Sequence, residues 1–138
     1  MLDLEGSESS IDVGDFSEIE TLANGKLPIL FKEIYLRNNG GFPRITEVEG
    51  DEYVFSINGF NSVKFGELPI EKLMQEYNAQ DKALHGYVPF AYDDGGNSFM
   101  LSLREEDAGT VYLLIQDGLQ MERVCASFDD FVNSLSIG

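Results

Sequence analysis

Cysteine and histidine each occur once in this 138-residue chain, as Cys125 and His85, and tryptophan is absent. A single cysteine cannot close an intramolecular disulfide, and one cysteine with one histidine cannot supply the ligands of a structural zinc site. A Ser-His-Asp or Cys-His catalytic centre would have to use His85. The sequence therefore excludes a multi-histidine metal site and disfavours catalysis, and we expect neither a metal nor a cofactor.

Basic residues are also scarce. Nine Lys and Arg stand against 25 Asp and Glu, which gives a formal net charge of −16. Nucleic acids and anionic membranes are bound through basic faces, so this balance argues against both as partners. It favours a basic protein partner, and repulsion between copies of the chain favours a monomer at low salt.

Long apolar runs and a secretory leader are missing as well. No segment approaches the roughly 20 apolar residues that cross a bilayer. The start of the chain, from Met1 to Glu5, has no positive segment followed by an apolar stretch. We therefore expect a cytoplasmic protein.

The chain does have enough apolar bulk for one core. Hydrophobic residues make up 43% of it, and they include ten Phe and six Tyr. Residues 1–15 are rich in Asp, Glu, Ser and Gly and contain no basic residue, which predicts an acidic, poorly ordered leader. The length suits a single domain over residues 16–138.

Hydrophobic periodicity predicts both helices and strands. Apolar residues recur at helical spacing in four segments, 16–23, 28–37, 70–77 and 127–135. Alternating or continuous apolar residues predict strands near 53–57, 63–65, 87–91, 99–103, 111–115 and 121–125. Together these elements predict an α+β fold, a mainly antiparallel sheet of about five to six strands with helices packed on it.

The most distinctive polar cluster is Asp93-Asp94-Gly95-Gly96-Asn97. Oxygen ligands at alternate positions are typical of a calcium loop, but Gly95, Ser98 and Arg104 stand at the third, sixth and twelfth positions and do not fit. The cluster instead favours a tight connection between two strands. Glu105-Glu106-Asp107 is typical of a hairpin tip, and paired carboxylates in these two clusters leave a carboxylate-based hydrolase as a distant alternative.

Several short motifs follow one another along residues 16–138. They are Leu27-Pro28-Ile29-Leu30-Phe31-Lys32, Asn39-Gly40-Gly41-Phe42-Pro43, Val88-Pro89-Phe90-Ala91-Tyr92-Asp93-Asp94-Gly95-Gly96-Asn97, Gly109-Thr110-Val111-Tyr112 and Ala126-Ser127-Phe128-Asp129-Asp130-Phe131. In their order and spacing the chain resembles the SUKH superfamily, the Smi/Knr-like proteins. The resemblance implies an α+β fold without enzymatic activity or a cofactor. It also implies the role of the bacterial members, which are immunity proteins that bind and neutralise a polymorphic toxin, often a nuclease.

Resemblance and charge together predict a non-enzymatic protein that binds and blocks a cognate toxin, with a regulatory adaptor of the same fold as the alternative. A nuclease groove is basic because it holds phosphate, so an acidic surface would complement it. The resemblance implies scaffold roles for Pro28, Gly40, Gly41, Gly95, Gly96 and Phe128. Two groups of acids are the candidate partner contacts: Asp93, Asp94, Glu105, Glu106 and Asp107, and Glu47, Glu49, Asp51 and Glu52.

Overall fold

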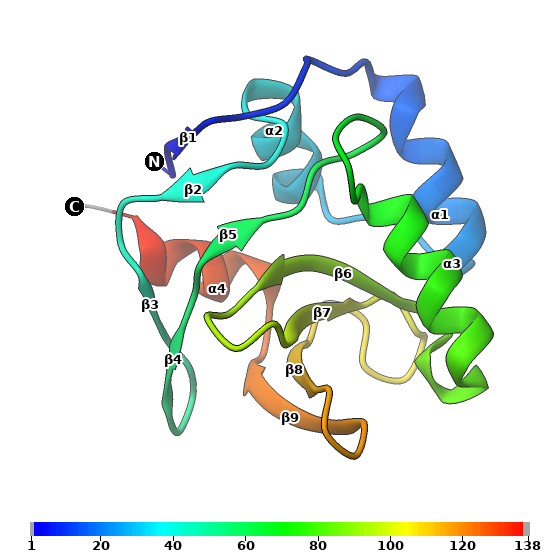
Figure 1. The fold of residues 1–138 in the computed structure, drawn as a ribbon, viewed down its shortest axis with the longest axis vertical. Helices are drawn as coiled ribbons and strands as arrows, with labels where there is room; N and C mark the ends of the chain where they lie inside the picture. The colour runs from blue at the N-terminus through cyan, green and yellow to red at the C-terminus, as the bar shows by residue number, and fades with distance from the viewer. Residues whose placement is uncertain (1, 137–138) are drawn as a thin grey trace.

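The centre of the molecule is a five-stranded antiparallel sheet in the order β5-β6-β7-β8-β9 (Figure 1). The structure is a computed structural model that describes residues 2–136. The central strands are β5 (Gly59–Phe60), β6 (Tyr87–Tyr92), β7 (Ser98–Ser102), β8 (Val111–Ile115) and β9 (Gln120–Cys125). Two smaller antiparallel pairs are β1 (Leu4–Glu5) with β2 (Phe42–Pro43), and β3 (Glu47–Glu49) with β4 (Val54–Ser56).

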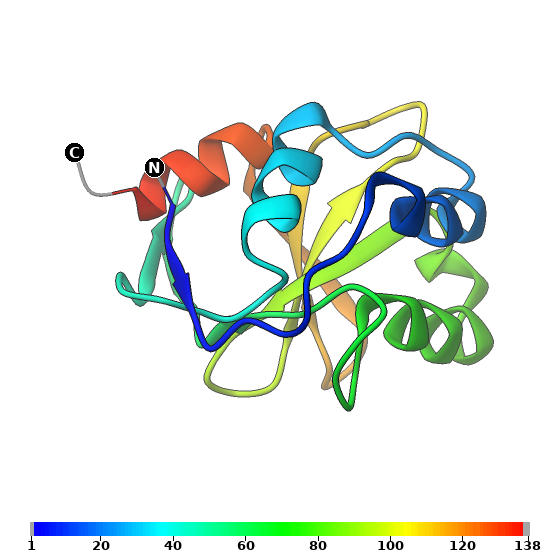
Figure 2. The same cartoon turned by 90° about the horizontal axis from the view of Figure 1, so that it is seen from above.

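Helices cover both faces of this sheet. They are α1 (Ser17–Ala23), α2 (Ile29–Arg37), α3 (Ile70–Gln80) and α4 (Phe128–Leu135), with short 3-10 turns η1 (Val13–Phe16) and η2 (Lys82–Leu84). In Figure 2, α2 (light blue) and α4 (orange-red) lie on one side of the sheet, and α3 (green) lies on the other. Among residues 2–136, no helix combines the length and the apolar character needed to cross a membrane. The predicted α+β fold is confirmed.

Successive side chains of β7 point to opposite faces of the sheet, so the strand contributes to two apolar clusters. Phe99 and Leu101 belong to the larger core cluster, which also contains Phe31 of α2 and Phe131 of α4. Met100 points to the other face, into the smaller cluster with Leu73, Tyr77 and Leu114. The strand predicted at 111–115 forms as β8 and lies between β7 and β9.

The prediction that residues 1–15 form a poorly ordered leader is wrong. Leu2, Leu4 and Ile11 are buried in the main core, and Leu4 pairs with Pro43 across the β1–β2 ladder. The acidic residues between them face solvent. Average composition hides this arrangement, because three well-placed apolar side chains are enough to anchor a segment that is otherwise polar.

The strand predicted at 63–65 is also wrong. The chain forms the short β5 and then an irregular connection over residues 61–69 that leads into α3. Val63 is buried, as a strand would require, but Lys64 has a left-handed φ of 68°, which ends any regular alternation. The sequence pattern therefore predicted the burial of Val63 correctly but predicted the wrong backbone conformation for residues 63–65.

Candidate functional site

The acidic residues predicted as partner contacts fall at three separate places. Asp93 and Asp94 lie in the β6–β7 turn, and the segment 105–107 lies in the β7–β8 connection. β7 has five residues, so these two groups stand roughly 17 Å apart at opposite ends of the strand. The second predicted group belongs to the β3–β4 hairpin: Glu47, Glu49, Asp51 and Glu52.

The Asp93 carboxylate closes the β6–β7 turn. Its Oδ1 accepts the N–H groups of Gly95 and Asn97 at 2.9 and 2.8 Å, and its Oδ2 accepts from the Asn97 side chain at 3.0 Å. The interpretation of this cluster as a tight turn is confirmed. Asp94 is exposed and accepts a hydrogen bond from Asn58 at 3.2 Å. Within residues 2–136, no three His, Cys, Asp or Glu side chains are grouped so that they could hold a metal ion.

Asp107 faces the sheet rather than a partner. It accepts hydrogen bonds from the hydroxyls of Ser102 and Tyr112, each at 2.6 Å. Partial burial opposes ionisation of Asp107, but these two hydrogen bonds, the Arg104 charge and a backbone hydrogen bond together lower its pKa. The same contact raises the pKa of Tyr112 to about 12. The neighbouring Glu106 pairs with Arg104 at 2.5 Å, so both acids are engaged within the fold.

The β3–β4 hairpin combines exposed acids with exposed apolar side chains. Glu47, Glu49 and Glu52 form no ion pair with any residue from 2 to 136. Tyr53 and Val54 are 59% and 60% exposed, and Val54 stands opposite Glu49 in the ladder. We call these five residues the acidic hairpin surface.

The tip of this hairpin is attached to the edge of the main sheet. Asp51 pairs with Arg123 of β9 at 3.1 Å, and its backbone N–H donates to the carbonyl of Val124 at 2.8 Å. Because β9 is the last strand of the sheet, these two contacts attach the acidic hairpin surface to the edge of the sheet. Asp51 is therefore a structural anchor for the surface that it borders.

The molecule carries a groove of about 530 Å³. It lies among the β1–β2 pair, β5, the connection 61–69, α3 and the β6–β7 turn. Its apolar lining includes Phe42 and Leu68, which are 51% and 44% exposed. Large apolar side chains exposed at a hollow are typical of contact sites.

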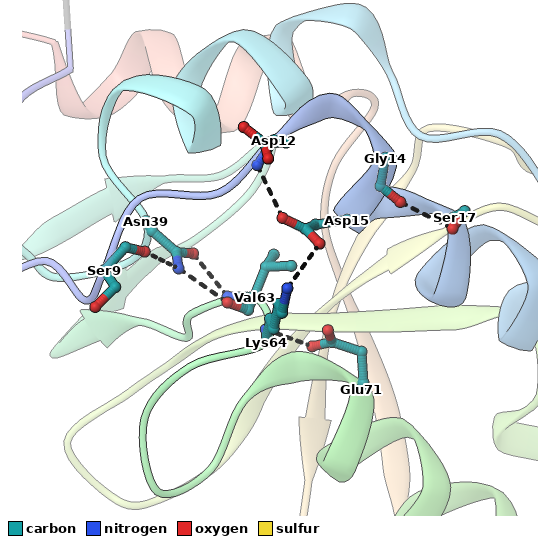
Figure 3. A network of polar contacts seen from close by, with 9 residues as sticks. All are labelled: Ser9, Asp12, Gly14, Asp15, Ser17, Asn39, Val63, Lys64 and Glu71. Atoms are coloured by element: carbon teal, nitrogen blue, oxygen red, sulfur yellow. Dashed lines mark hydrogen bonds and ion pairs between the residues drawn. The ribbon is translucent and has the colours of Figure 1, made fainter.

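Asn39 fixes the wall of the groove that residues 61–69 form (Figure 3). This buried side chain donates from Nδ2 to the carbonyls of Ser9 and Val63 at 2.9 and 2.8 Å. Its Oδ1 accepts the Val63 N–H at 2.7 Å. One amide thus joins the N-terminal segment, the end of α2 and the connection 61–69, three segments far apart in the sequence.

Two carboxylates hold Lys64, the next residue of the connection 61–69 (Figure 3). Glu71 Oε1 accepts the Lys64 N–H at 3.0 Å, and Lys64 Nζ pairs with Asp15 at 3.2 Å. Burial raises the pKa of Glu71, and nearby Glu18 and Asp15 add repulsion that the Lys64 N–H only partly offsets. The connection is therefore ordered before any partner arrives.

The polar lining of the groove is acidic. Glu8 and Glu67 are exposed at its border, and no basic side chain is among the described residues that line it. Asn61 also lines it, and the buried Oδ1 of Asn61 has no hydrogen-bond partner within residues 2–136. An unpartnered buried acceptor usually costs about 1–3 kcal/mol, so its presence requires an explanation.

The residues that nucleophilic catalysis would need are not assembled. Cys125 is buried, its thiol contacts the Ser127 carbonyl at 3.3 Å, and burial raises its pKa to about 11. His85 lines a different hollow of about 490 Å³, which Cys125 does not line and where Arg104 and Glu106 form their ion pair. Cys125 belongs to the main core cluster.

The comparisons with known proteins agree with this architecture. The family model described as the SMI1 / KNR4 family (SUKH-1) matches residues 10–134. The chain belongs to this family, and the resemblance seen in its motifs is confirmed. Domains of this family are generally of a non-catalytic, immunity type. No curated protein is significantly similar to the chain.

Sequence reasoning missed the groove. Its border residues come from distant segments: Glu8, Phe42, Asn61, Glu67 and Leu68. Phe42 and Leu68 did carry a weak signal, since each is a large apolar residue beside Pro or Gly and outside any helical or strand period. Nothing in the local sequence shows that they share one hollow.

Proposed function

We propose that the chain is a non-enzymatic immunity protein that binds a basic toxin domain and blocks it in the cytoplasm. The observation that carries this proposal is the acidic hairpin surface, where three exposed carboxylates without ion-pair partners among residues 2–136 surround Tyr53 and Val54. Family membership and the net charge of −16 support it.

The two kinds of side chain have different roles in this proposal. The carboxylates of Glu47, Glu49 and Glu52 speed the encounter with a basic surface and disfavour acidic competitors. Tyr53 and Val54 supply apolar area that loses water on contact, and such aromatic anchors carry most of the binding energy of an interface. The rigid attachment through Asp51 reduces the conformational entropy lost on binding.

A nuclease is the class of toxin that this surface fits best. A nuclease must hold phosphate, so its active groove is basic, and a protein that occupies this groove excludes the nucleic acid. Blockade of this kind requires no bond-making by the chain.

Co-expression with any toxin domain that a gene neighbouring this chain's gene encodes tests the proposal. In the hairpin variant, Glu47, Glu49 and Glu52 are each replaced by Lys. In the matched control, the exposed residues Glu33, Glu76 and Asp117, which lie on other elements, are each replaced by Lys. Both variants change the net charge equally, so only the location of the change differs.

We expect the wild type and the control to protect cells and the hairpin variant to fail. Thermal denaturation verifies that all three proteins are folded. Equal protection by the hairpin variant and the control would contradict the proposed surface. Failure of the wild type to bind the toxin would contradict the proposed function.

A further inference from the structure

We infer that the open edge of β9 receives an extended strand of the partner, which pairs with it through main-chain hydrogen bonds and places a basic side chain beside Glu122. The inference deepens the proposed function and rests on it for the partner's identity as a toxin domain. It is carried by the exposed, unpaired edge of residues 120–123, by the acids around this edge and by the adjoining acidic hairpin surface.

β9 is a long edge strand of the central sheet (orange in Figure 1). It pairs with β8 on one side, and alternate residues of an antiparallel edge strand direct their N–H and C=O groups away from the neighbouring strand. Three of the four residues 120–123 are exposed, and outside β8 no backbone group from residue 2 to 136 pairs with them. The hairpin tip reaches only Val124, through the Asp51 N–H. The remaining donors and acceptors of this edge are therefore unpaired within the described chain.

The edge lacks the features that usually prevent strand addition. Such features are proline, lysine, a bulge or a very short strand. Residues 120–123 contain neither proline nor lysine and pair with residues 112–115 in regular register, and the bulge comes only after Arg123. At the opposite border of the sheet, by contrast, β2 is joined to β5 by the bridge between Gly41 and Phe60, and the terminal β1 has only two residues. The edge of β9 is therefore the one of these two borders that suits an added strand.

The charge around the edge favours a basic strand. Asp117 in the β8–β9 turn and Glu122 in β9 are exposed, and Glu122 forms no ion pair with any residue from 2 to 136. Arg123, the only basic residue of β9, is already paired with Asp51 at 3.1 Å. A second copy of this chain, with the same acidic edge and the same net charge of −16, is therefore an unsuitable occupant.

The register of β9 gives the two faces of an added strand different neighbours. Glu122 stands opposite Leu113 of the larger core cluster, so its side chain lies on the face of the sheet that carries α4. Met121 stands opposite Leu114 and is only partly buried against the smaller cluster on the other face. Because side chains alternate along an extended strand, a basic residue beside Glu122 is flanked by residues that lie beside Met121 and are favoured as apolar.

The edge of β9 and the acidic hairpin surface adjoin each other. The two contacts of Asp51, with the Arg123 side chain and the Val124 carbonyl, place the hairpin tip at the end of residues 120–123. A strand that lies along this edge therefore ends beside the exposed Glu52 and Tyr53. In such an interface the edge supplies main-chain hydrogen bonds, and the hairpin supplies the apolar anchor.

The test is an NMR measurement of amide hydrogen exchange in the isotopically labelled chain with three capped hexapeptides. The first peptide alternates arginine and valine. The second has the same side chains but carries methyl groups on all its backbone nitrogens, so that it cannot pair as a strand, and the third alternates glutamate and valine. A net charge of −16 attracts any cation, but charge alone does not protect the amides of residues 120–123 from exchange.

We expect only the first peptide to slow the exchange of alternate amides within residues 120–123. The slowing should reach roughly tenfold when the peptide concentration is about ten times its Kd, because exchange then proceeds from the small unbound fraction. The methylated peptide and the glutamate–valine peptide should leave these exchange rates unchanged.

One variant and its matched control separate pairing at this edge from general attraction. Glu122→Lys is expected to weaken binding of the arginine–valine peptide by roughly fivefold, because it replaces an attractive cross-strand pair with a repulsive one. The same variant should bind the glutamate–valine peptide more tightly than the wild type does. Glu76→Lys, an equal change of charge at an exposed position of α3, should change both affinities by less than about twofold. The comparison of the three peptides uses the wild-type chain, so it decides the inference even if a variant is unstable.

Three results would overturn the inference. Unchanged exchange at residues 120–123 with the saturating arginine–valine peptide would show that no strand is added at this edge. Equal affinity of the methylated peptide would show that charge alone causes binding. Exchange that slows with protein concentration alone would make a second copy of the chain the occupant.

The inference and the proposed function fail separately. If Glu122→Lys neutralises a toxin domain as the wild type does, and the amides of residues 120–123 remain unprotected in that complex, the edge is not a contact site and the proposed function stands. If the arginine–valine peptide protects these amides but the wild type binds no toxin, the proposed function fails and the edge site stands.

Discussion

Asn39 shows how much of this fold depends on one side chain. Three hydrogen bonds join its buried amide to Ser9 and Val63. Asn39→Ala leaves the buried Val63 N–H without a partner and takes one donor from each of the Ser9 and Val63 carbonyls, so we expect the free energy of unfolding to fall by roughly 2–4 kcal/mol. Urea denaturation measures this loss. The adjacent Asn38, whose side chain forms no hydrogen bond with residues 2–136, provides the control in Asn38→Ala, and an equal effect of both changes would contradict the assigned role.

Asp107 gives a prediction that depends on pH. Its pKa in the folded chain lies below the ordinary value of 3.8, so its ionised form stabilises the fold at neutral pH, and this contribution is lost as pH falls through the folded pKa. Asp107→Asn should therefore lower stability by roughly 1–2 kcal/mol at neutral pH.

The pH series decides whether that loss comes from the charge. The difference in the free energy of unfolding between the wild type and Asp107→Asn should become smaller as pH falls below 3.8, because the carboxylate of the wild type then becomes protonated. Glu105→Gln, which changes a neighbouring exposed acid, should show little difference at any pH. A gap that stays constant from neutral to acidic pH would rule out the assigned role of the ionised carboxylate.

The residue scale also shows what the sequence could and could not reveal. The turn role of Asp93 was predictable, because Asp before Gly-Gly-Asn favours local hydrogen bonds between side chain and backbone. The inward orientation of Asp107 was not, since its partners Ser102 and Tyr112 belong to two different strands. Local patterns predict local bonds, whereas bonds across a sheet need the register of its strands.

At the scale of elements, β1 shows that the N-terminal segment is part of the fold. Leu4 is buried against the main core and pairs with Pro43 of β2. Leu4→Ala is expected to lower the free energy of unfolding by roughly 2–3 kcal/mol, because it removes buried apolar area and leaves a cavity. Chemical denaturation checks the value, with the exposed neighbour change Glu5→Ala as control. If Leu4→Ala is as stable as the wild type, the N-terminal segment does not contribute to the core, and this result would contradict the account.

Elements with a clear period were predicted well. The recurrence of Ile70, Leu73, Met74 and Tyr77 placed α3, and the apolar period over 127–135 placed α4. Ser127 caps α4 by accepting the Asp130 N–H at 3.0 Å. The connection 61–69 could not be predicted, because Asn39 and Glu71 fix it from outside the segment. The groove was missed for the same reason, since this connection forms one of its walls.

At the scale of the whole molecule, only some of the acidic side chains are free to contact a partner. Part of the acidic set is used inside the fold, as at Asp93 and Asp107. The exposed carboxylates of the acidic hairpin surface and of the groove border remain available to a partner. The net charge supports the proposed class of partner, but only the structure separates acids that stabilise the fold from acids that are free to contact another protein.

The most direct test of the proposed function is the association rate of the purified chain with a toxin domain that the co-expression assay identifies, measured by stopped flow at increasing salt. Electrostatic steering predicts a rate that falls by at least roughly tenfold between low and high salt, while dissociation changes little. The hairpin variant should associate slowly at every salt concentration. A rate that is independent of salt, or equal for the wild type and the hairpin variant, would contradict the account.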